Sequence, residues 1–363
     1  MKLGKDHQVV GRHLLVGLTA TKLTSKEAAL MRGLRPSGII LFKRNFERVS
    51  TWMNTLERLL AEAKDAVESE DLLISVDHEG GRVHRFPDPV THFPYAAYWR
   101  ECAAEVAECM ARELHSLGFN LSFAPLLDTN LDTTSRVIGD RAFSRIPAEV
   151  SAAAAAFRES LERNGLLSCG KHFPGHGGTS ADSHFELPVL DKSKDELLDL
   201  DLIPFVDYLG HNPPLLMSAH VMFPKLDKEL PASLSPSVLS DFLRNELGYQ
   251  GAIITDDLEM KALAQWLPAQ RAVLALLAST DLLLEGDSKD IAPLEQGKLM
   301  VEGLLDALDK QTLPESIFWS SQKRITQLIA TSRKLQHTIT KRNPREIVAC
   351  TRHRELRARI ATA

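Results

Sequence analysis

Side chains that could do acid–base chemistry are concentrated in one stretch, from Lys171 to Pro188, which reads K-H-F-P-G-H-G-G-T-S-A-D-S-H-F-E-L-P. The glycines and prolines within it indicate a loop whose backbone approaches another group closely. Asp182 and His184 are two residues apart, which lets the carboxylate orient the imidazole and raise its basicity. The stretch therefore predicts an acid–base site rather than an ordinary connecting loop.

Two further segments bring carboxylates and arginines to similar positions. Residues 253–260, I-I-T-D-D-L-E-M, carry Asp256 directly after an apolar run, and residues 76–86, V-D-H-E-G-G-R-V-H-R-F, combine a carboxylate with a glycine turn and two arginines. A carboxylate nucleophile that faces an acid/base group across a polar pocket is the layout of a retaining glycosidase. A histidine tuned by Asp182 could protonate the leaving oxygen there and then activate water.

Eight short apolar runs, each followed by a helical pattern, must position these segments. The runs are nearly continuous rather than alternating, as expected for strands buried on both faces. The predicted strands span 13–18, 38–42, 72–76, 120–124, 167–170, 215–218, 252–255 and 281–284. The predicted helices span 25–35, 49–69, 100–117, 147–164, 194–209, 236–246, 261–278 and 292–309. Capping boxes at Thr24/Glu27 and Ser193/Glu196 mark two helix starts.

This alternation predicts an α/β protein with a single (β/α)8 TIM-type barrel. An open doubly wound sheet also alternates strands and helices, but no G-x-G-x-x-G loop follows the first strand. Polar residues follow six of the predicted strands, at the end of the barrel where enzymes of this fold keep their chemistry. They are Asp77, Asp128, Lys171 with His172, His220, Asp256 with Asp257, and Glu285.

Composition excludes several classes of partner. The 363 residues are 44% hydrophobic and 25% charged, with a net charge of −5, which argues against a nucleic-acid or anionic-membrane surface. The apolar run 14–16 is too short for a signal peptide, and no run approaches the roughly 18 residues of a membrane span. The four cysteines show no C-x-x-C spacing and are typical of reduced thiols. We therefore expect a cytoplasmic protein.

The C-terminal end differs in charge from the rest of the chain. Residues 333–363 hold nine Lys or Arg against two Glu, a composition typical of a solvated helix or a frayed tail. We expect residues 1–335 to form the single catalytic barrel and residues 336–363 a basic C-terminal helix or tail.

Seven motifs resemble those of the family 3 glycoside hydrolases, specifically their single-domain β-N-acetylglucosaminidase branch. They occur in the family's order, cover about residues 8–285, and include one highly specific element, K-H-F-P-G-H-G followed by D-S-H. The motifs are G-I-I-L-F-K-R-N (38–45), V-D-H-E-G-G-R-V-H-R-F (76–86), A-P-L-L-D (124–128), R-V-I-G-D-R-A-F (136–143), K-H-F-P-G-H-G-G-T-S-A-D-S-H (171–184), S-A-H-V-M-F-P (218–224) and T-D-D-L-E-M (255–260).

Carried over by position, the resemblance implies that Asp256 is the nucleophile and His184 the general acid/base, with Asp182 as its dyad partner. It also implies that five residues hold the terminal sugar: Asp77, Arg85, Arg141, Lys171 and His172. Arg85 is the weakest of these assignments, because Arg82 lies in the same turn. Asp257, Asp128, His220, Glu285 and His176 are expected to have structural or supporting roles.

The resemblance further implies a retaining exo-β-N-acetylglucosaminidase that needs no cofactor and no metal. It implies cytoplasmic cell-wall recycling, in which a monomer removes terminal N-acetylglucosamine from small peptidoglycan fragments such as GlcNAc-1,6-anhydro-MurNAc and its peptides. Rivals are a β-glucosidase, a β-xylosidase or a phosphorylase. Two alternatives belong to other functional classes: a metal-dependent hydrolase, which chelators would inhibit, and a non-catalytic sugar-binding protein.

Overall fold

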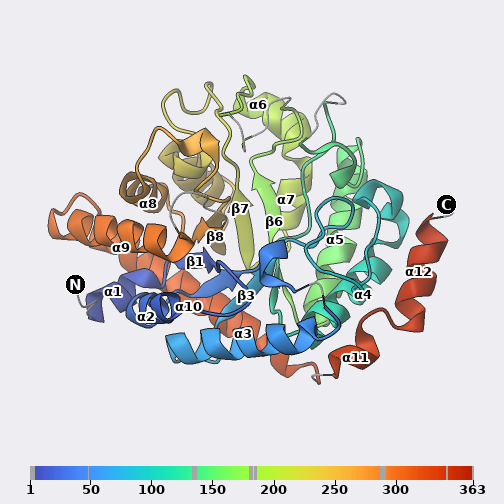
Figure 1. The fold of residues 1–363 in the computed structure, drawn as a ribbon. Coiled ribbons are helices and arrows are strands. Elements are labelled where there is room, and N and C mark those ends of the chain that lie inside the picture. Colours follow the sequence, from blue (N-terminus) through green and yellow to red (C-terminus); the bar gives the residue numbers. More distant parts are fainter. Residues whose placement is uncertain are drawn as a thin grey trace.

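The computed structural model of the chain describes residues 5–47, 49–132, 137–179, 183, 186–286, 292–340 and 342–361. Short parallel strands form its centre and helices surround them (Figure 1). The strands are β1 (Leu14–Gly17), β2 (Gly38–Ile40), β3 (Leu73–Val76), β4 (Leu121–Ser122), β5 (Leu167–Ser168), β6 (Gly170–Phe173), β7 (Leu215–Ser218), β8 (Ala252–Thr255) and β9 (Leu283–Glu285).

The strands follow one another around a ring. One sheet has the order β5-β4-β3-β2-β1-β9 and the other the order β6-β7-β8. Parallel bridges join the two sheets, from Leu126 to Lys171 on one side and from Ile254 to Leu282 on the other. The predicted α/β architecture with a TIM-type barrel is therefore confirmed.

One strand boundary was predicted wrongly. We expected the fifth strand to end at residue 170, with Lys171 and His172 opening the loop that follows. Instead the chain forms β5, breaks at Cys169 and continues as β6 as far as Phe173. Lys171 and His172 are thus held by strand backbone, which fixes their direction more firmly than a loop would.

Helices cover the outer face of the ring. The α-helices are α1 (Lys5–Gly11), α2 (Ser25–Leu34), α3 (Trp52–Val67), α4 (Ala103–Ser116), α5 (Pro147–Arg163), α6 (Lys194–Glu196), α7 (Ile203–Leu209), α8 (Pro268–Leu277), α9 (Pro293–Asp309), α10 (Glu315–His337), α11 (Pro344–Ile347) and α12 (Thr351–Ala361). Short 3-10 turns are η1 (Lys43–Asn45), η2 (Ala96–Tyr98), η3 (Arg100–Cys102), η4 (Gly139–Arg141), η6 (Ala232–Leu234) and η8 (Lys261–Leu263). Two predicted α-helical segments contain π-helix instead, at η5 (Leu197–Asp201) and η7 (Ser237–Glu246).

Local signals account for several helix starts. Thr24 accepts a hydrogen bond from the amide of Glu27, whose side chain accepts one from the amide of Thr24, and Ser193 and Glu196 form the same reciprocal pair. Both predicted capping boxes are confirmed. None of the helices in the described residues combines the length and the apolar character that crossing a membrane requires.

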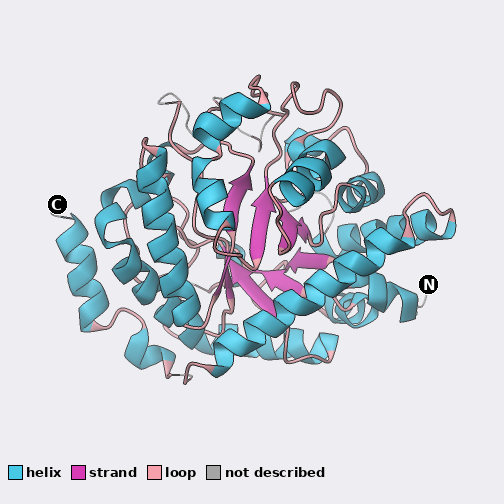
Figure 2. Cartoon of the chain, turned by 180° about the vertical axis from the view of Figure 1, so that it is seen from behind, coloured by secondary structure: helices cyan, strands magenta, loops and turns pink. Residues whose placement is uncertain are grey.

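The interior of the barrel is apolar at its lower end, where the strands begin. Side chains such as Leu15, Leu73 and Leu215 form one buried cluster there together with Ile325 and Leu328 of α10. The long helix α10, which the sequence patterns did not predict, lies across the strands and closes this end (Figure 2). Polar side chains lie at the other end of the barrel, where the strands end.

The C-terminal segment is helical, and most of its side chains are exposed, but one side of it is packed against the barrel. Residues 351–361 form α12, which packs on the outside of α4 (Figure 1). Its side chains His353, Leu356 and Ile360 are buried.

Candidate active site

A tight turn after β3 carries two carboxylates and an arginine. Asp77 and Glu79 are two residues apart in extended chain, so their side chains point to the same side. The turn then reverses at Gly80 and Gly81, whose φ angles of +90° and +52° favour glycine, and it returns toward Arg85. A Cβ on Gly81 would lie 2.1 Å from the ring of Tyr95, so no larger residue fits there.

Lys171 of β6 lies between these two carboxylates. Its Nζ is 2.9 Å from Oδ1 of Asp77 and 2.5 Å from Oε1 of Glu79. Glu79 in turn accepts two hydrogen bonds from the guanidinium of Arg141, at 2.8 and 2.9 Å, and Asp77 accepts one from Arg85 at 3.1 Å. Four of the five predicted sugar-binding residues thus belong to one ionic network.

Glu79 is the member of this network that the sequence analysis missed. The sequence contained a signal for it. Glu79 is two residues after Asp77, and in extended chain such side chains point to the same side. The structure also separates the two arginines of the turn. Arg85 reaches Asp77, whereas Arg82 donates to the carbonyl of Val137 at 2.6 Å.

The charges in the network stabilise one another. Burial alone would raise the pKa of Asp77, but Lys171 and Arg85 outweigh it and lower that pKa to about 2. Arg141 and Lys171 likewise hold the pKa of the buried Glu79 well below its ordinary range. Burial opposes the positive charge of Lys171, but its two carboxylate partners raise its pKa. All of these groups are therefore charged at neutral pH, and hydrogen bonds made by charged groups are stronger than those between neutral groups.

His172, the fifth predicted sugar-binding residue, is oriented by Asp128. Its Nδ1 lies 2.7 Å from Oδ2 of Asp128, which also accepts the backbone amide of His172 at 3.2 Å. The other oxygen of Asp128 accepts the amide of His176 at 2.6 Å, and the ring of His176 contacts Thr179. Because Nδ1 is engaged, Nε2 of His172 is the nitrogen that faces the site.

Asp256 follows β8 and lies next to His172. Its Oδ2 is 3.8 Å from Nε2 of His172, too far for a hydrogen bond, and its Oδ1 accepts the amide of Asp257 at 2.8 Å. Burial would raise the pKa of Asp256, but His172, His220 and the Asp257 amide together lower it. Asp256 is thus an ionised carboxylate with one oxygen that forms no hydrogen bond within the described residues.

The neighbours of Asp256 have supporting geometry. Asp257 accepts the amide of Gly286 at 3.0 Å. His220 is completely buried, lies 3.0 Å from the Asp257 carbonyl and 2.6 Å from Ser233, and burial lowers its pKa to about 4. Burial, together with the nearby Asp257 and Glu259, raises the pKa of Glu285 well above its ordinary value.

Asp182 and His184, the predicted acid/base dyad, lie outside the described residues. Ser183 between them is described and buried, and its carbonyl accepts the amide of Ala262 at 3.2 Å. Ala262 belongs to η8, in the loop that begins with Asp256. The backbone between the dyad residues is therefore anchored to the loop that carries Asp256.

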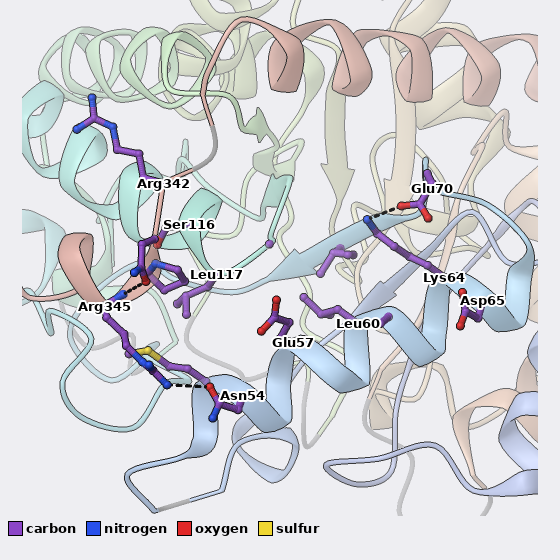
Figure 3. Close-up of a pocket in the computed structure, with 16 residues that line it drawn as sticks. Asn54, Glu57, Leu60, Lys64, Asp65, Glu70, Ser116, Leu117, Arg342 and Arg345 are labelled. Carbon is purple, nitrogen blue, oxygen red and sulfur yellow. Dashed lines mark hydrogen bonds and ion pairs between the residues drawn. The ribbon is translucent and has the colours of Figure 1, made fainter.

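Several cavities lie around the barrel, and two of them differ in their position relative to the candidate site. One of about 720 Å³ opens beside Arg85, between the segments that follow β2 and β3, and its lining includes Lys43, His84 and Trp52. Another of about 680 Å³ lies between α3, the end of α4 and the segment before α11 (Figure 3). This second cavity is near the beginnings of β3 and β4, away from the ionic network, so it is not part of the candidate site.

The described residues also bear on the metal-dependent alternative. Among them, no group of three or more His, Cys, Asp or Glu side chains is arranged to hold a metal ion. His172, His176 and His220 instead contact Asp128, Thr179, Ser233 and backbone groups.

The chain is similar to a known family and to several known proteins. The model of the glycosyl hydrolase family 3 N-terminal domain matches residues 8–328. A β-hexosaminidase from Methylococcus capsulatus is 40% identical over 276 residues, 74% of this chain and 80% of that protein. One from Idiomarina loihiensis is 38% identical over 281 residues, 75% of this chain and 82% of that protein.

Solved structures are similar over nearly the whole chain. NagZ from Neisseria gonorrhoeae aligns with a TM-score of 0.77 and 31% identity, covering 96% of this chain and 97% of that one. A family 3 β-N-acetylglucosaminidase from Paenibacillus sp. aligns with a TM-score of 0.88 and 30% identity, covering 98% of this chain and 68% of that one. The chain belongs to glycosyl hydrolase family 3. Within that family it is an enzyme of the β-N-acetylhexosaminidase class.

Proposed function

We propose that the protein is a retaining exo-β-N-acetylglucosaminidase that works through a covalent glycosyl-enzyme. The observation that carries the proposal is the position of Asp256. It is an ionised carboxylate whose Oδ2 forms no hydrogen bond within the described residues and lies 3.8 Å from Nε2 of His172, on the rim that also holds the Asp77–Lys171–Glu79–Arg141 network. A nucleophile beside a set of charged hydroxyl-binding groups is what a glycosidase of this mechanism requires.

The proposed reaction has two steps. An oxygen of Asp256 attacks the anomeric carbon, the bond from that carbon to the leaving oxygen breaks, and His184 gives its proton to the leaving oxygen. Water then attacks the same carbon, His184 takes a proton from that water, and the bond to Asp256 breaks. Asp182 orients His184 in both steps. The anchoring of Ser183 to the loop after Asp256 supports this arrangement.

Asp77, Arg85, Arg141, Lys171 and His172 are proposed to hold the terminal N-acetylglucosamine. Asp77 accepts hydrogen bonds from sugar hydroxyls, whereas Lys171 and His172 donate to them. Arg141 contacts Glu79 through two nitrogens, so it can act by holding Glu79 and Lys171 in place as well as by touching the sugar.

The proposed substrates are small peptidoglycan fragments, GlcNAc-1,6-anhydro-MurNAc and its peptides, processed in cytoplasmic cell-wall recycling by a monomer. This part rests on the similarity to NagZ, which spans nearly the whole of both chains. We also propose that residues 1–335 form the catalytic barrel and residues 336–363 an appended basic segment.

Intact mass after incubation with a 5-fluoro N-acetylglucosaminyl fluoride tests the nucleophile. We expect a single sugar adduct on the wild type, none on Asp256→Ala, and the same adduct in the presence of a chelator, because a carboxylate traps the sugar without a metal. Absence of an adduct together with chelator-sensitive activity on the same sugar would replace the proposal with the metal-dependent one.

The role of His184 is tested through the leaving group. His184→Ala should slow hydrolysis of substrates with poor leaving groups far more than that of activated aryl glycosides, since only poor leaving groups need a proton. The ratio of the two kcat/KM values measures this difference. Equal losses on both substrates would show that His184 is not the acid.

A further inference from the structure

A single buried carboxylate joins the C-terminal segment to the loop before α4. Glu113 of α4 is 1% exposed and accepts four hydrogen bonds. Two come from Thr91, through its amide at 2.9 Å and its hydroxyl at 2.7 Å. The others come from the amide of Ala349 at 2.8 Å and from Nδ1 of the fully buried His353 at 2.7 Å. A buried carboxylate needs such partners, so the three segments depend on one another.

A second connection runs from α12 to the same loop. Nε of Arg357 donates to the carbonyl of His92 at 2.8 Å, directly after Thr91. The ring of His92 stacks on the ring of His84 with centroids 4.2 Å apart, and its Nε2 donates to the carbonyl of Gly81 at 2.6 Å. The amide of Gly81 in turn donates to the carbonyl of Phe93 at 2.9 Å. The loop 91–93 thus holds the turn that carries Glu79 and Arg85.

We propose that α12 is a positioning element for the sugar-binding turn, acting through His353 and Glu113 and through Arg357 and His92. The proposal rests on the proposed function of that turn in holding the terminal sugar. His353 and Arg357 are positioning residues: in this structure they contact the loop 91–93 and Glu113, not the Asp77–Lys171 network. Their removal should loosen the turn and weaken sugar binding while leaving the reacting groups of Asp256 and His184 unchanged.

Other side chains of α12 provide matched controls. Arg359 contacts the exposed Glu105 of α4, and Arg352 contacts the half-buried Glu108 of the same helix. These ion pairs attach α12 to α4 but do not reach the loop 91–93. If α12 only stabilised the fold, Arg357→Gln and Arg359→Gln would have equivalent consequences for sugar binding.

The test compares His353→Leu, His353→Asn, Arg357→Gln and Arg359→Gln with the wild type in the full-length protein. The measurements are kcat and KM for 4-nitrophenyl N-acetyl-β-glucosaminide, the inhibition constant of N-acetylglucosamine, and Tm. The amide of asparagine can occupy the place of the histidine Nδ1, so His353→Asn should retain the bond to Glu113. Hydrogen exchange of residues 79–93 reports directly on the order of the turn.

We expect His353→Leu to raise the inhibition constant and KM roughly three- to tenfold, with kcat changed less than about twofold. Arg357→Gln should give a smaller shift in the same direction with faster exchange over 79–93, and His353→Asn and Arg359→Gln should resemble the wild type. If His353→Leu does not fold, the test is the comparison of the inhibition constants of Arg357→Gln and Arg359→Gln, because both change exposed residues of α12.

Two outcomes would overturn the proposal: unchanged inhibition constants in His353→Leu and Arg357→Gln, or equal shifts in Arg357→Gln and Arg359→Gln. An Arg85→Gln arm separates this failure from failure of the proposed sugar site. If Arg85→Gln weakens N-acetylglucosamine binding and the α12 variants do not, only the positioning role is wrong. If Arg85→Gln also has no effect, the assignment of the turn itself is wrong.

Discussion

Asp281 and Asp256 are buried carboxylates at opposite ends of neighbouring strands. Asp281, below β9, is completely buried, and both of its oxygens are used: one accepts from Arg324 at 2.8 Å, the other from Arg244 at 2.7 Å and from the Ile253 amide at 2.8 Å. Asp256, above β8, has a side chain that is 14% exposed and an oxygen without a hydrogen bond in the described residues.

The difference shows that a buried charge does not by itself mark a catalytic site. At the lower end the protein supplies every partner of Asp281, so no capacity is left for a ligand. At the upper end one oxygen of Asp256 forms no hydrogen bond within the described residues, and the side chain of Asp77, although paired with Lys171 and Arg85, is still 18% exposed. Within the described residues, an oxygen left without a hydrogen bond is what distinguishes Asp256 from Asp281.

The largest expected effect is on turnover in Asp256→Asn. The amide keeps the shape of the side chain but cannot form the glycosyl-enzyme, so kcat should fall on the order of a thousandfold or more while Tm changes little. Steady-state kinetics on an aryl N-acetylglucosaminide and thermal unfolding measure the two quantities. A variant that retained most of its kcat would remove Asp256 as the nucleophile.

Asp281→Asn should show the reverse pattern. It leaves Arg244 and Arg324 without a buried counter-charge, which costs about 3–5 kcal/mol of the free energy of unfolding. Denaturant unfolding measures this loss, and kcat of the folded fraction should stay within about twofold of the wild type, because Asp281 lies at the end of the barrel opposite Asp256. A large fall in kcat without a loss of stability would contradict the division between the two ends.

The smallest effect concerns acid stability and Asp77. Its folded pKa of about 2 lies below the ordinary 3.8, so its contribution is fully present above about pH 4 and is lost as the pH falls through 2. The shift corresponds to about 2 kcal/mol. Denaturant unfolding at several pH values should show a shallower acid loss in Asp77→Asn than in the wild type. Asp309→Asn, an exposed change at the end of α9, should keep the wild-type slope, and equal slopes in all three proteins would contradict the ionic network.

Local patterns were sufficient for much of the fold. Buried strands are recognisable as continuous apolar runs. The capping boxes at Thr24 and Ser193 depend only on residues three positions apart, so the sequence predicts them as well. The break at Cys169 and the continuation of the strand through Lys171 and His172 depend on pairing with β7 and on the bridge to Leu126, which are not local. The helix α10 also went unpredicted, since its place is set by the open lower end of the barrel.

The sequence by itself determined which residue types reach the rim, and the motifs determined the family. Only the tertiary structure decided which of them touch: that Glu79 joins Lys171 to Arg141, that Arg85 rather than Arg82 meets Asp77, and that α12 is docked through Glu113. Spacing along the chain determines to which side of a strand or helix each side chain points. Contacts between residues such as Asp77 and Lys171, 94 positions apart, are set by how the strands close into a ring.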